Sequence, residues 1–425
     1  MAEALPAIHT LPNGVRVICD PMPGLESLAL SVVVKGGARW ESPGVAGWAH
    51  LLEHMVFKGA GERSARDIVE AIEAEGGQIN AATGQERTSF QVRCLKGGLP
   101  LGMAVIADLI RRPRIDADEL EREKDVVAQE IAEAADQPDD LVFDLALAAA
   151  FGDHPLGRPI LGKVESLAPA KRETLSAFHR GLYAPERLVV SAAGAVDEAE
   201  LLRLAEALFG DMAAAEPLPP PTAPTFLGAR SSEKRKLEQA HVVLMLPGVD
   251  RRHPDIFAQG AFVEILGGGM SSRLFQEARE ARGLAYAIDA YEDAYDDAGL
   301  VGVYAGVAAA KATETARLSA EILKRLTADA TPGELARARA QVRAGYFMRR
   351  EQPLARAEQN AAQILFFDRL FPTTEVAAEI DAVSLGDLKR VGERMIASGQ
   401  SASAVLGPGR ALPAGEAFAE VLAAG

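Results

Sequence analysis

Two histidines and a glutamate lie close together in a segment that is otherwise apolar. The stretch AGWAHLLEHMVFKGAG, residues 46–61, contains His50, Glu53 and His54 among tryptophan, leucine, methionine, valine and phenylalanine side chains. On a helix, residues four apart lie on one face, one turn from each other, so the two imidazoles can bind one metal ion. Glu53 stands beside them and can act on a metal-bound water without being a ligand.

The metal that we expect at such a pair is zinc. Zinc takes nitrogen and carboxylate ligands in a tetrahedral arrangement and, in catalytic sites, leaves the fourth position to water. The pKa of that water falls from ~15.7 to about 7, which makes it a nucleophile at neutral pH. Glu53 would take its proton and deliver it to the leaving amine. The alternative is a helix with two buried, hydrogen-bonded histidines and no metal.

A zinc site of this kind needs a third protein ligand from elsewhere in the chain. The acidic segment DADELEREKDVVAQEIAEAADQPDDL, residues 116–141, is predicted to be helical and is the obvious source. Glu123 and Glu130 are seven residues apart and share one face with Val127. The segment carries several other acids, most of which should face water, so spacing alone does not select the ligand.

The segments that would position these residues occur twice. The first copy has an apolar strand at 28–37 and a helix at 45–57, and the second has a strand at 241–248 and a helix at 256–266. A constant offset of 211 residues aligns the two copies. At this offset, both histidines of the first copy align with apolar residues of the second. The second copy therefore keeps the scaffold and loses the imidazoles.

A proline-rich stretch separates the two copies. We expect an N-terminal zinc-binding domain at 1–212, a linker at 213–232 and a C-terminal domain at 233–425, because so many prolines favour an extended linker. Strands, hairpin-like segments and long helices alternate in both halves, which predicts α+β domains, each with an antiparallel or mixed sheet covered by helices. The long helices are expected at about 97–112, 116–150 and 310–327.

Composition excludes several classes of protein. The net charge of −15 argues against nucleic acid or an anionic membrane as a partner. The longest apolar runs are too short to span a bilayer. Cys19 and Cys94 cannot form a disulfide framework, and the first residues lack the features of a secretory signal, so we expect a cytoplasmic protein.

The motif HLLEHMVFKG, with a glutamate 76 residues after His54, resembles the pitrilysin/insulinase family of zinc metallopeptidases. These are inverzincins, in which HxxEH reverses the HExxH order. The match is to a small two-domain bacterial branch similar to mitochondrial processing peptidase, and it extends through LPNGVRV, EREKDVVAQEI, DDLVFD and GGGMSSRLFQEAREARGLAYAI. The resemblance implies that His50, His54 and Glu130 bind zinc and that Glu53 is the base. It also implies that Glu123 is a second acidic residue that supports a ligand.

The resemblance further implies residues that hold the substrate. Segment 76–95 reads as a glycine turn followed by strands, and Asn80 and Ala81 correspond to an edge strand to which a peptide adds through main-chain hydrogen bonds. The alternative is an ordinary hairpin. Arg279 and Tyr286, seven apart, correspond to a pair that reaches the active site from the other domain and stabilises the oxyanion. Without the resemblance, they read as a surface helix residue and a core edge.

The expected function is zinc-dependent hydrolysis of peptide bonds in short or unfolded peptides. Larger relatives carry four such domains around a chamber, so the resemblance implies that two of these chains face each other. Either a homodimer or a heterodimer with a related subunit is compatible. The alternatives are a non-catalytic partner subunit and a peptide-binding clamp with structural zinc. Silent subunits lose motif residues, whereas structural zinc sites are usually closed by four protein ligands.

Overall fold

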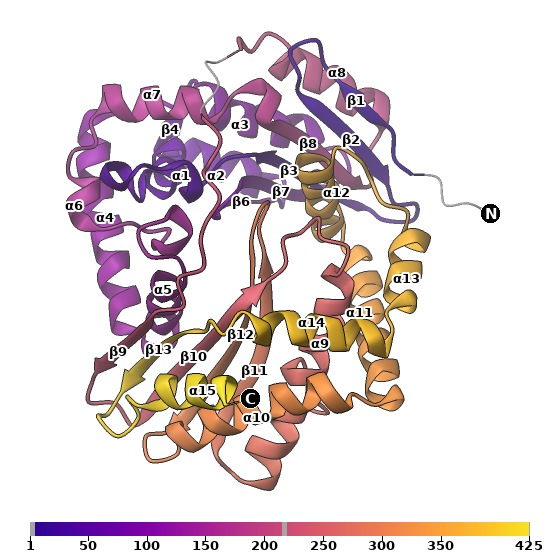
Figure 1. The fold of residues 1–425 in the computed structure, drawn as a ribbon. Helices are drawn as coiled ribbons and strands as arrows, with labels where there is room; N and C mark the ends of the chain where they lie inside the picture. The colour runs from indigo at the N-terminus through magenta and orange to yellow at the C-terminus, as the bar shows by residue number, and fades with distance from the viewer. Residues whose placement is uncertain (1–4, 215–218, 425) are drawn as a thin grey trace. The chain divides into compact units, whose positions relative to one another are not determined.

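The computed structural model describes residues 5–214 and 219–424, which form two compact units (Figure 1). The described residues of 1–131, 159–221 and 347–373 make up the first unit. Those of 132–158, 222–346 and 374–425 make up the second. Each unit therefore incorporates one segment from the opposite half of the sequence.

The first unit is built on a six-stranded sheet in the order β1-β2-β8-β3-β7-β6. Only β2 and β8 run parallel among these neighbours, and β6 ends the sheet as a free edge. The central strands β3 and β8 are buried almost throughout, which explains their continuous apolar sequences. The strands are β1 (Ile8–Thr10), β2 (Arg16–Pro21), β3 (Ser27–Val34), β6 (Gln78–Thr83), β7 (Thr88–Leu95) and β8 (Leu188–Gly194).

Helices cover both faces of this sheet. On one face, the main core includes buried residues of α1, α2, α3, α7 and α8. On the other face, α12 packs Ile364 and Phe366 against Ile18, Val33 and Val189 of the strands. The helices of this unit are α1 (Trp48–Phe57), α2 (Ala65–Ala74), α3 (Leu99–Arg111), α4 (Ala117–Asp136), α6 (Val164–Leu167), α7 (Arg172–Leu182), α8 (Glu198–Phe209) and α12 (Pro353–Phe367), of which α4 ends in the second unit.

A buried carboxylate fixes α12 to the sheet. Asp20 of β2 accepts hydrogen bonds from Arg356 Nε at 2.7 Å and from Asn360 Nδ2 at 2.8 Å. Asp20 is only 3% exposed, and a buried charge is costly unless it is paired. Both donors that compensate the Asp20 charge come from the same helix. A segment from the second half of the sequence is thus an integral part of the first unit.

The second unit repeats the plan of the first. Its sheet has the order β11-β12-β10-β13-β9, with β13 and β9 parallel, which matches the order β6-β7-β3-β8-β2. The prediction of a duplicated α+β fold with helix-covered mixed sheets is confirmed. The strands are β9 (Arg230–Lys234), β10 (Gln239–Gly248), β11 (Ala285–Ala294), β12 (Gly299–Ala308) and β13 (Ala402–Gly407).

One face of this second sheet is covered by α9, α10, α14 and α15, and the other by α5. The predicted helix at 116–150 is in fact two helices, because Pro138 lacks an N–H and begins α5 after Gln137. The helices are α5 (Pro138–Phe151), α9 (Ile256–Gly267), α10 (Ala312–Asp329), α11 (Pro332–Arg350), α13 (Thr373–Ala382), α14 (Leu385–Ala397) and α15 (Ala414–Ala423).

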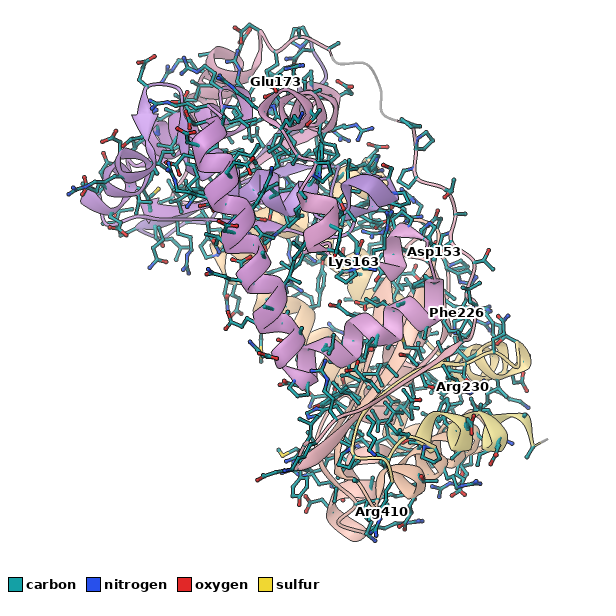
Figure 2. The ribbon with its side chains drawn as sticks, turned by 90° about the vertical axis from the view of Figure 1, so that its left-hand side faces the viewer. Asp153, Lys163, Glu173, Phe226, Arg230 and Arg410 are labelled. Carbon is teal, nitrogen blue, oxygen red and sulfur yellow. The ribbon has the colours of Figure 1, made fainter. Side chains whose placement is uncertain are left out.

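The predicted linker at 213–232 is described in part, since residues 215–218 lie outside the described residues. Its C-terminal end is held in the second unit, where the Phe226 ring lies 6.1 Å from Phe151 of α5 (Figure 2). The chain then enters β9 at Arg230. In the described part of the chain, no helix is both long and apolar enough to cross a membrane.

Candidate metal centre and peptide-binding edge

Helix α1 presents its histidines because its opposite side is anchored in the core. Leu51, Leu52, Met55 and Val56 are fully buried, whereas His50, Glu53 and His54 are partly exposed. The helix starts after Gly47, which has a φ of 90°. The buried Glu41 carboxylate accepts the first free N–H groups, from Gly47 at 2.8 Å and from Ala49 at 2.6 Å. An acid therefore caps the positive end of the helix.

Glu130 of α4 meets both histidines. Its Oε2 lies 3.8 Å from His50 Nε2 and 3.5 Å from His54 Nε2, and the three ligand atoms lie within 4.8 Å of one another. Tetrahedral zinc with bonds of roughly 2.0–2.1 Å separates its ligand atoms by about 3.4 Å. Small side-chain movements would bring this set to that spacing. The three residues therefore fit a zinc ion.

A second acid of α4 orients His54. Glu123 is 4% exposed, and its Oε2 lies 3.0 Å from His54 Nδ1. A carboxylate at this distance assigns the imidazole proton to Nδ1, which leaves Nε2 free to bind a metal. Lys58 Nζ lies 2.8 Å from the other Glu123 oxygen and compensates its charge. Glu123 therefore contacts a predicted ligand and stands outside the three-residue set.

His50 is held neutral by its surroundings. Burial and, to a lesser extent, the neighbouring His54 lower the pKa of His50 to about 4. A neutral imidazole is the form that binds a metal. In the described structure, the Nδ1 atom of His50 is buried without a hydrogen-bond partner. The other ring nitrogen, Nε2, faces Glu130.

Glu53 lies between the metal-binding set and the sheet edge. Thr83 Oγ1, at the end of β6, donates a hydrogen bond of 2.5 Å to Glu53 Oε2. The sequence predicts Glu53 as a base and does not reveal this contact, because Thr83 is 30 residues away. Burial, with a smaller effect from the Glu53 charge, raises the pKa of the Tyr183 hydroxyl. The Thr83 hydroxyl is thus a neutral donor that orients the Glu53 carboxylate.

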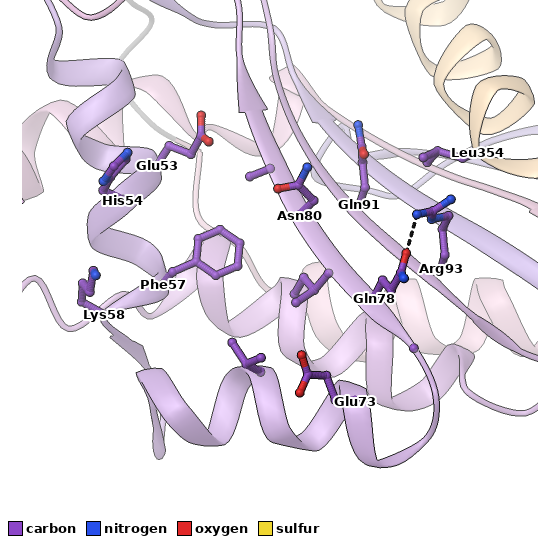
Figure 3. A pocket seen from close by; sticks show the side chains of 14 residues that line it. Glu53, His54, Phe57, Lys58, Glu73, Gln78, Asn80, Gln91, Arg93 and Leu354 are labelled. Carbon is purple, nitrogen blue, oxygen red and sulfur yellow. Dashed lines mark hydrogen bonds between the residues drawn. The ribbon is translucent and has the colours of Figure 1, made fainter. Parts of the chain in front are cut away.

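A cavity of about 740 Å³ adjoins these residues (Figure 3). Glu53, His54, Phe57 and Lys58 of α1 line it, and so does edge strand β6, including Asn80 and Ala81. Asn80 is exposed, whereas Ala81 is 8% exposed. The cavity therefore joins the histidine helix to the free edge at which the sequence predicts peptide binding.

Arg279 and Tyr286 belong to the second unit. Arg279 lies in a π-helix, Phe275–Ala281, with its guanidinium 4.8 Å from the Phe275 ring centroid. Tyr286 is 63% exposed, so it is not a core residue, and it lies at a register irregularity near the start of β11. Such irregularities re-aim side chains. The role of the pair stays a prediction.

Comparison with known proteins identifies the family. Residues 16–164 match Insulinase (Peptidase family M16), and residues 169–342 match Peptidase M16 inactive domain. The chain belongs to peptidase family M16. An uncharacterized zinc protease of Mycobacterium tuberculosis is 36% identical over 96% of this chain and 94% of its own length. The uncharacterized zinc protease YmxG of Bacillus subtilis is 34% identical over 89% of this chain and 92% of its own length.

Solved structures of the same fold include a protease from Helicobacter pylori, with a TM-score of 0.87, 22% identity and coverage of 95% of this chain and 100% of that one. A chain of Complex III2 from Candida albicans has a TM-score of 0.86 and 18% identity, with coverage of 98% of this chain and 99% of that one. At these identities, the likeness concerns the fold. The predicted family and fold class of this M16 chain are confirmed.

Proposed function

We propose that this M16 chain is a zinc-dependent endopeptidase that hydrolyses peptide bonds in short or unfolded peptides. The observation that carries the proposal is the convergence of His50, His54 and Glu130, with Glu53 beside them and outside the ligand set. Relatives that match over nearly their whole length are named zinc proteases, and these names support the same interpretation.

Each residue has a distinct task in the proposed reaction. The Nε2 atoms of His50 and His54 and the carboxylate of Glu130 would hold zinc. When bound there, zinc supplies a Lewis acid that polarises a carbonyl and makes water nucleophilic near neutral pH. Glu53, oriented by Thr83, takes a proton from the attacking water and passes it to the leaving amine. Glu123 holds the proton on His54 Nδ1.

The substrate would lie along β6. A free strand edge offers unpaired main-chain N–H and C=O groups, so an extended peptide can add to it with little sequence preference. Asn80 and Ala81 are the residues that we assign to this contact. Because Thr83 of the same strand donates to Glu53, a peptide on this edge would run past the catalytic carboxylate.

The alternatives are a non-catalytic partner subunit and a peptide-binding clamp of the same fold. A clamp with structural zinc would be expected to use four protein ligands, whereas the described cluster has three with a carboxylate beside them. That difference favours catalysis.

The variant Glu53→Gln tests the assignment. It should keep the fold and stoichiometric zinc and lose cleavage of a quenched fluorescent peptide, because an amide cannot accept the proton. Unchanged cleavage would falsify the base. No cleavage by the parent protein across a diverse peptide pool would favour the non-catalytic alternatives.

We further propose that the working form is a dimer of this chain or a heterodimer with a related subunit. Arg279 and Tyr286 would act on peptide bound to the partner. Mixing a Glu53→Gln chain with an Arg279→Ala chain should then restore activity, whereas no recovery in proven mixed dimers would contradict the shared site. We also propose a cytoplasmic setting, because Cys19 and Cys94 are buried free thiols, which suits a reducing compartment.

A further inference from the structure

The cavity beside β6 has two walls of different chemistry, one on each face of the sheet. In a strand, successive side chains point to opposite faces, and directly paired residues of neighbouring strands share a face. A peptide that adds to β6 would therefore send alternate side chains to the two walls. This inference rests on the proposed function, since it concerns the peptide that the site would bind.

The first wall lies on the helix side, where an apolar surface adjoins the polar and charged residues of α1. Phe57 of α1 and Ile79 of β6 pack against the main core, and Val69 of α2 completes this part of the lining. The charged Glu73 of α2 also lines the cavity (Figure 3). Every second side chain of the added peptide would meet this surface.

The second wall lies on the α12 side and is polar. Asn80 pairs with Gln91, and Gln78 pairs with Arg93, so these four side chains share the face opposite Ile79. Gln91 Nε2 donates to Glu358 Oε1 of α12, which fixes the amide. Leu354, also of α12, completes the lining (Figure 3).

Arg93 is the charged group of this wall whose donors are not neutralised. Its side chain is exposed and its Nη2 donates to the Gln78 side-chain oxygen, a neutral partner. Within residues 5–214 and 219–424, Arg93 has no carboxylate partner. A guanidinium has five N–H donors in a planar fork that suits carboxylates.

The reach of Arg93 extends to the edge. Neighbouring strands are about 4.8 Å apart, so a peptide strand beyond β6 would be about 10 Å from β7. Arg93 already extends across Gln78 toward that edge, as its hydrogen bond requires. A glutamate on the added strand, opposite Gln78 and on the same face, could meet the guanidinium halfway. Glu358 of α12 accepts a hydrogen bond from Gln91.

We propose that Arg93 is a specificity-determining residue that selects a carboxylate side chain at one position of the bound peptide, opposite Gln78. The alternate positions of the peptide meet the first wall and do not respond to Arg93. Leu354 and the fixed Gln91 limit the size of side chains at the neighbouring position on the Arg93 side. The selection is thus made partly by α12, a helix from the second half of the sequence.

The test uses one peptide framework in which each position in turn carries Glu, Gln or Lys. The parent, Arg93→Gln and Arg93→Glu are compared by kcat and KM. Arg66→Gln is the matched control, since Arg66 is an exposed arginine of α2 that pairs with Glu70 and does not line the cavity. Binding of the same peptides to Glu53→Gln, with and without the Arg93 change, is measured by fluorescence anisotropy.

At one position, Glu should be favoured over Gln by about threefold to tenfold, mainly through KM, because an exposed charge pair is screened by water. Arg93→Gln should remove this preference, Arg93→Glu should reverse it toward Lys, and the Arg66 control should keep it. An unchanged ranking at every position in Arg93→Glu would overturn the proposal. Charge selection in binding without any cleavage by the parent would instead contradict the proposed function and leave the role of Arg93 standing.

Discussion

Replacing Glu123 by glutamine should weaken zinc binding although Glu123 is not one of the predicted ligands. In the parent, one carboxylate oxygen lies 3.0 Å from His54 Nδ1 and the other 2.8 Å from Lys58 Nζ. A glutamine has one acceptor oxygen and one NH₂ donor. If its oxygen accepts from His54, its NH₂ group faces the Lys58 ammonium, and one of the two contacts is lost.

The expected loss follows from the burial and the charge of this contact. Glu123 is 4% exposed, so water cannot replace the missing carboxylate oxygen. Changes to a group that orients a metal ligand cost between about tenfold and a hundredfold in affinity, roughly 1.4–2.7 kcal/mol. We expect Glu123→Gln to fall in this range, because an amide keeps one hydrogen bond and removes the negative charge.

Zinc affinity is measured by competition with a chromophoric chelator, and the fold is checked by urea unfolding of the metal-free protein. Glu121→Gln is the matched control, since Glu121 is on the same helix, its side chain is 71% exposed, and it pairs with Lys124 at 2.7 Å. The control should bind zinc like the parent. Affinity of Glu123→Gln within about threefold of the parent would refute the proposed role of the carboxylate, because the cited range begins at tenfold.

Three other changes test further parts of the structure. Thr83→Val should lower kcat by about tenfold with little change in KM, because it removes the hydrogen bond to the Glu53 carboxylate, whereas Thr83→Ser should keep near-parental kinetics. Hydrogen bonds from Arg390 and then Arg394 lower the pKa of Asp255 to about 2, below its unfolded value of about 3.9. Asp255→Asn should therefore cost about 2 kcal/mol in urea unfolding at pH 7, and this difference should shrink as the pH falls from about 4 toward 2. Ile364→Ala, at a side chain 1% exposed, should cost about 2–4 kcal/mol, while Val126→Ala, at a side chain 37% exposed, should change stability by about 0.5 kcal/mol or less.

The histidine pair could be predicted because both residues lie in one short segment, where their spacing alone indicates that they share a helix face. Helical periodicity brings His50 and His54 to one face, and the apolar residues between them identify the opposite face as buried. The third ligand required more than spacing. Glu123 and Glu130 share a face of α4, and both are close to His54, but only the structure shows that Glu123 meets Nδ1 while Glu130 meets Nε2.

Some contacts that support these residues could also be predicted from local spacing, and others could not. Lys58 is four residues after His54, so the helical spacing that relates the histidines could have indicated its proximity to the site. Thr83 offered no such signal, because its contact with Glu53 depends on how the end of β6 meets α1 across the cavity. A contact of this type is set by tertiary packing.

The exchange of α5 and α12 between the units shows where sequence periodicity stops being informative. The uninterrupted apolar run of β3 indicates that both faces of the strand are covered, and it does not say by which segment. The covering helix α12 begins more than 300 residues later, and it is held by Asp20, Arg356 and Asn360, all polar residues that read as ordinary surface positions. The same helix supplies Leu354 to the cavity beside the histidines. A fragment that ends in the linker would therefore leave Ile18, Val33 and Val189 uncovered and lose one cavity wall, although it would retain every predicted zinc ligand. The half of this M16 chain that carries the predicted zinc ligands consequently depends on the second half for stability and for the shape of the cavity beside them.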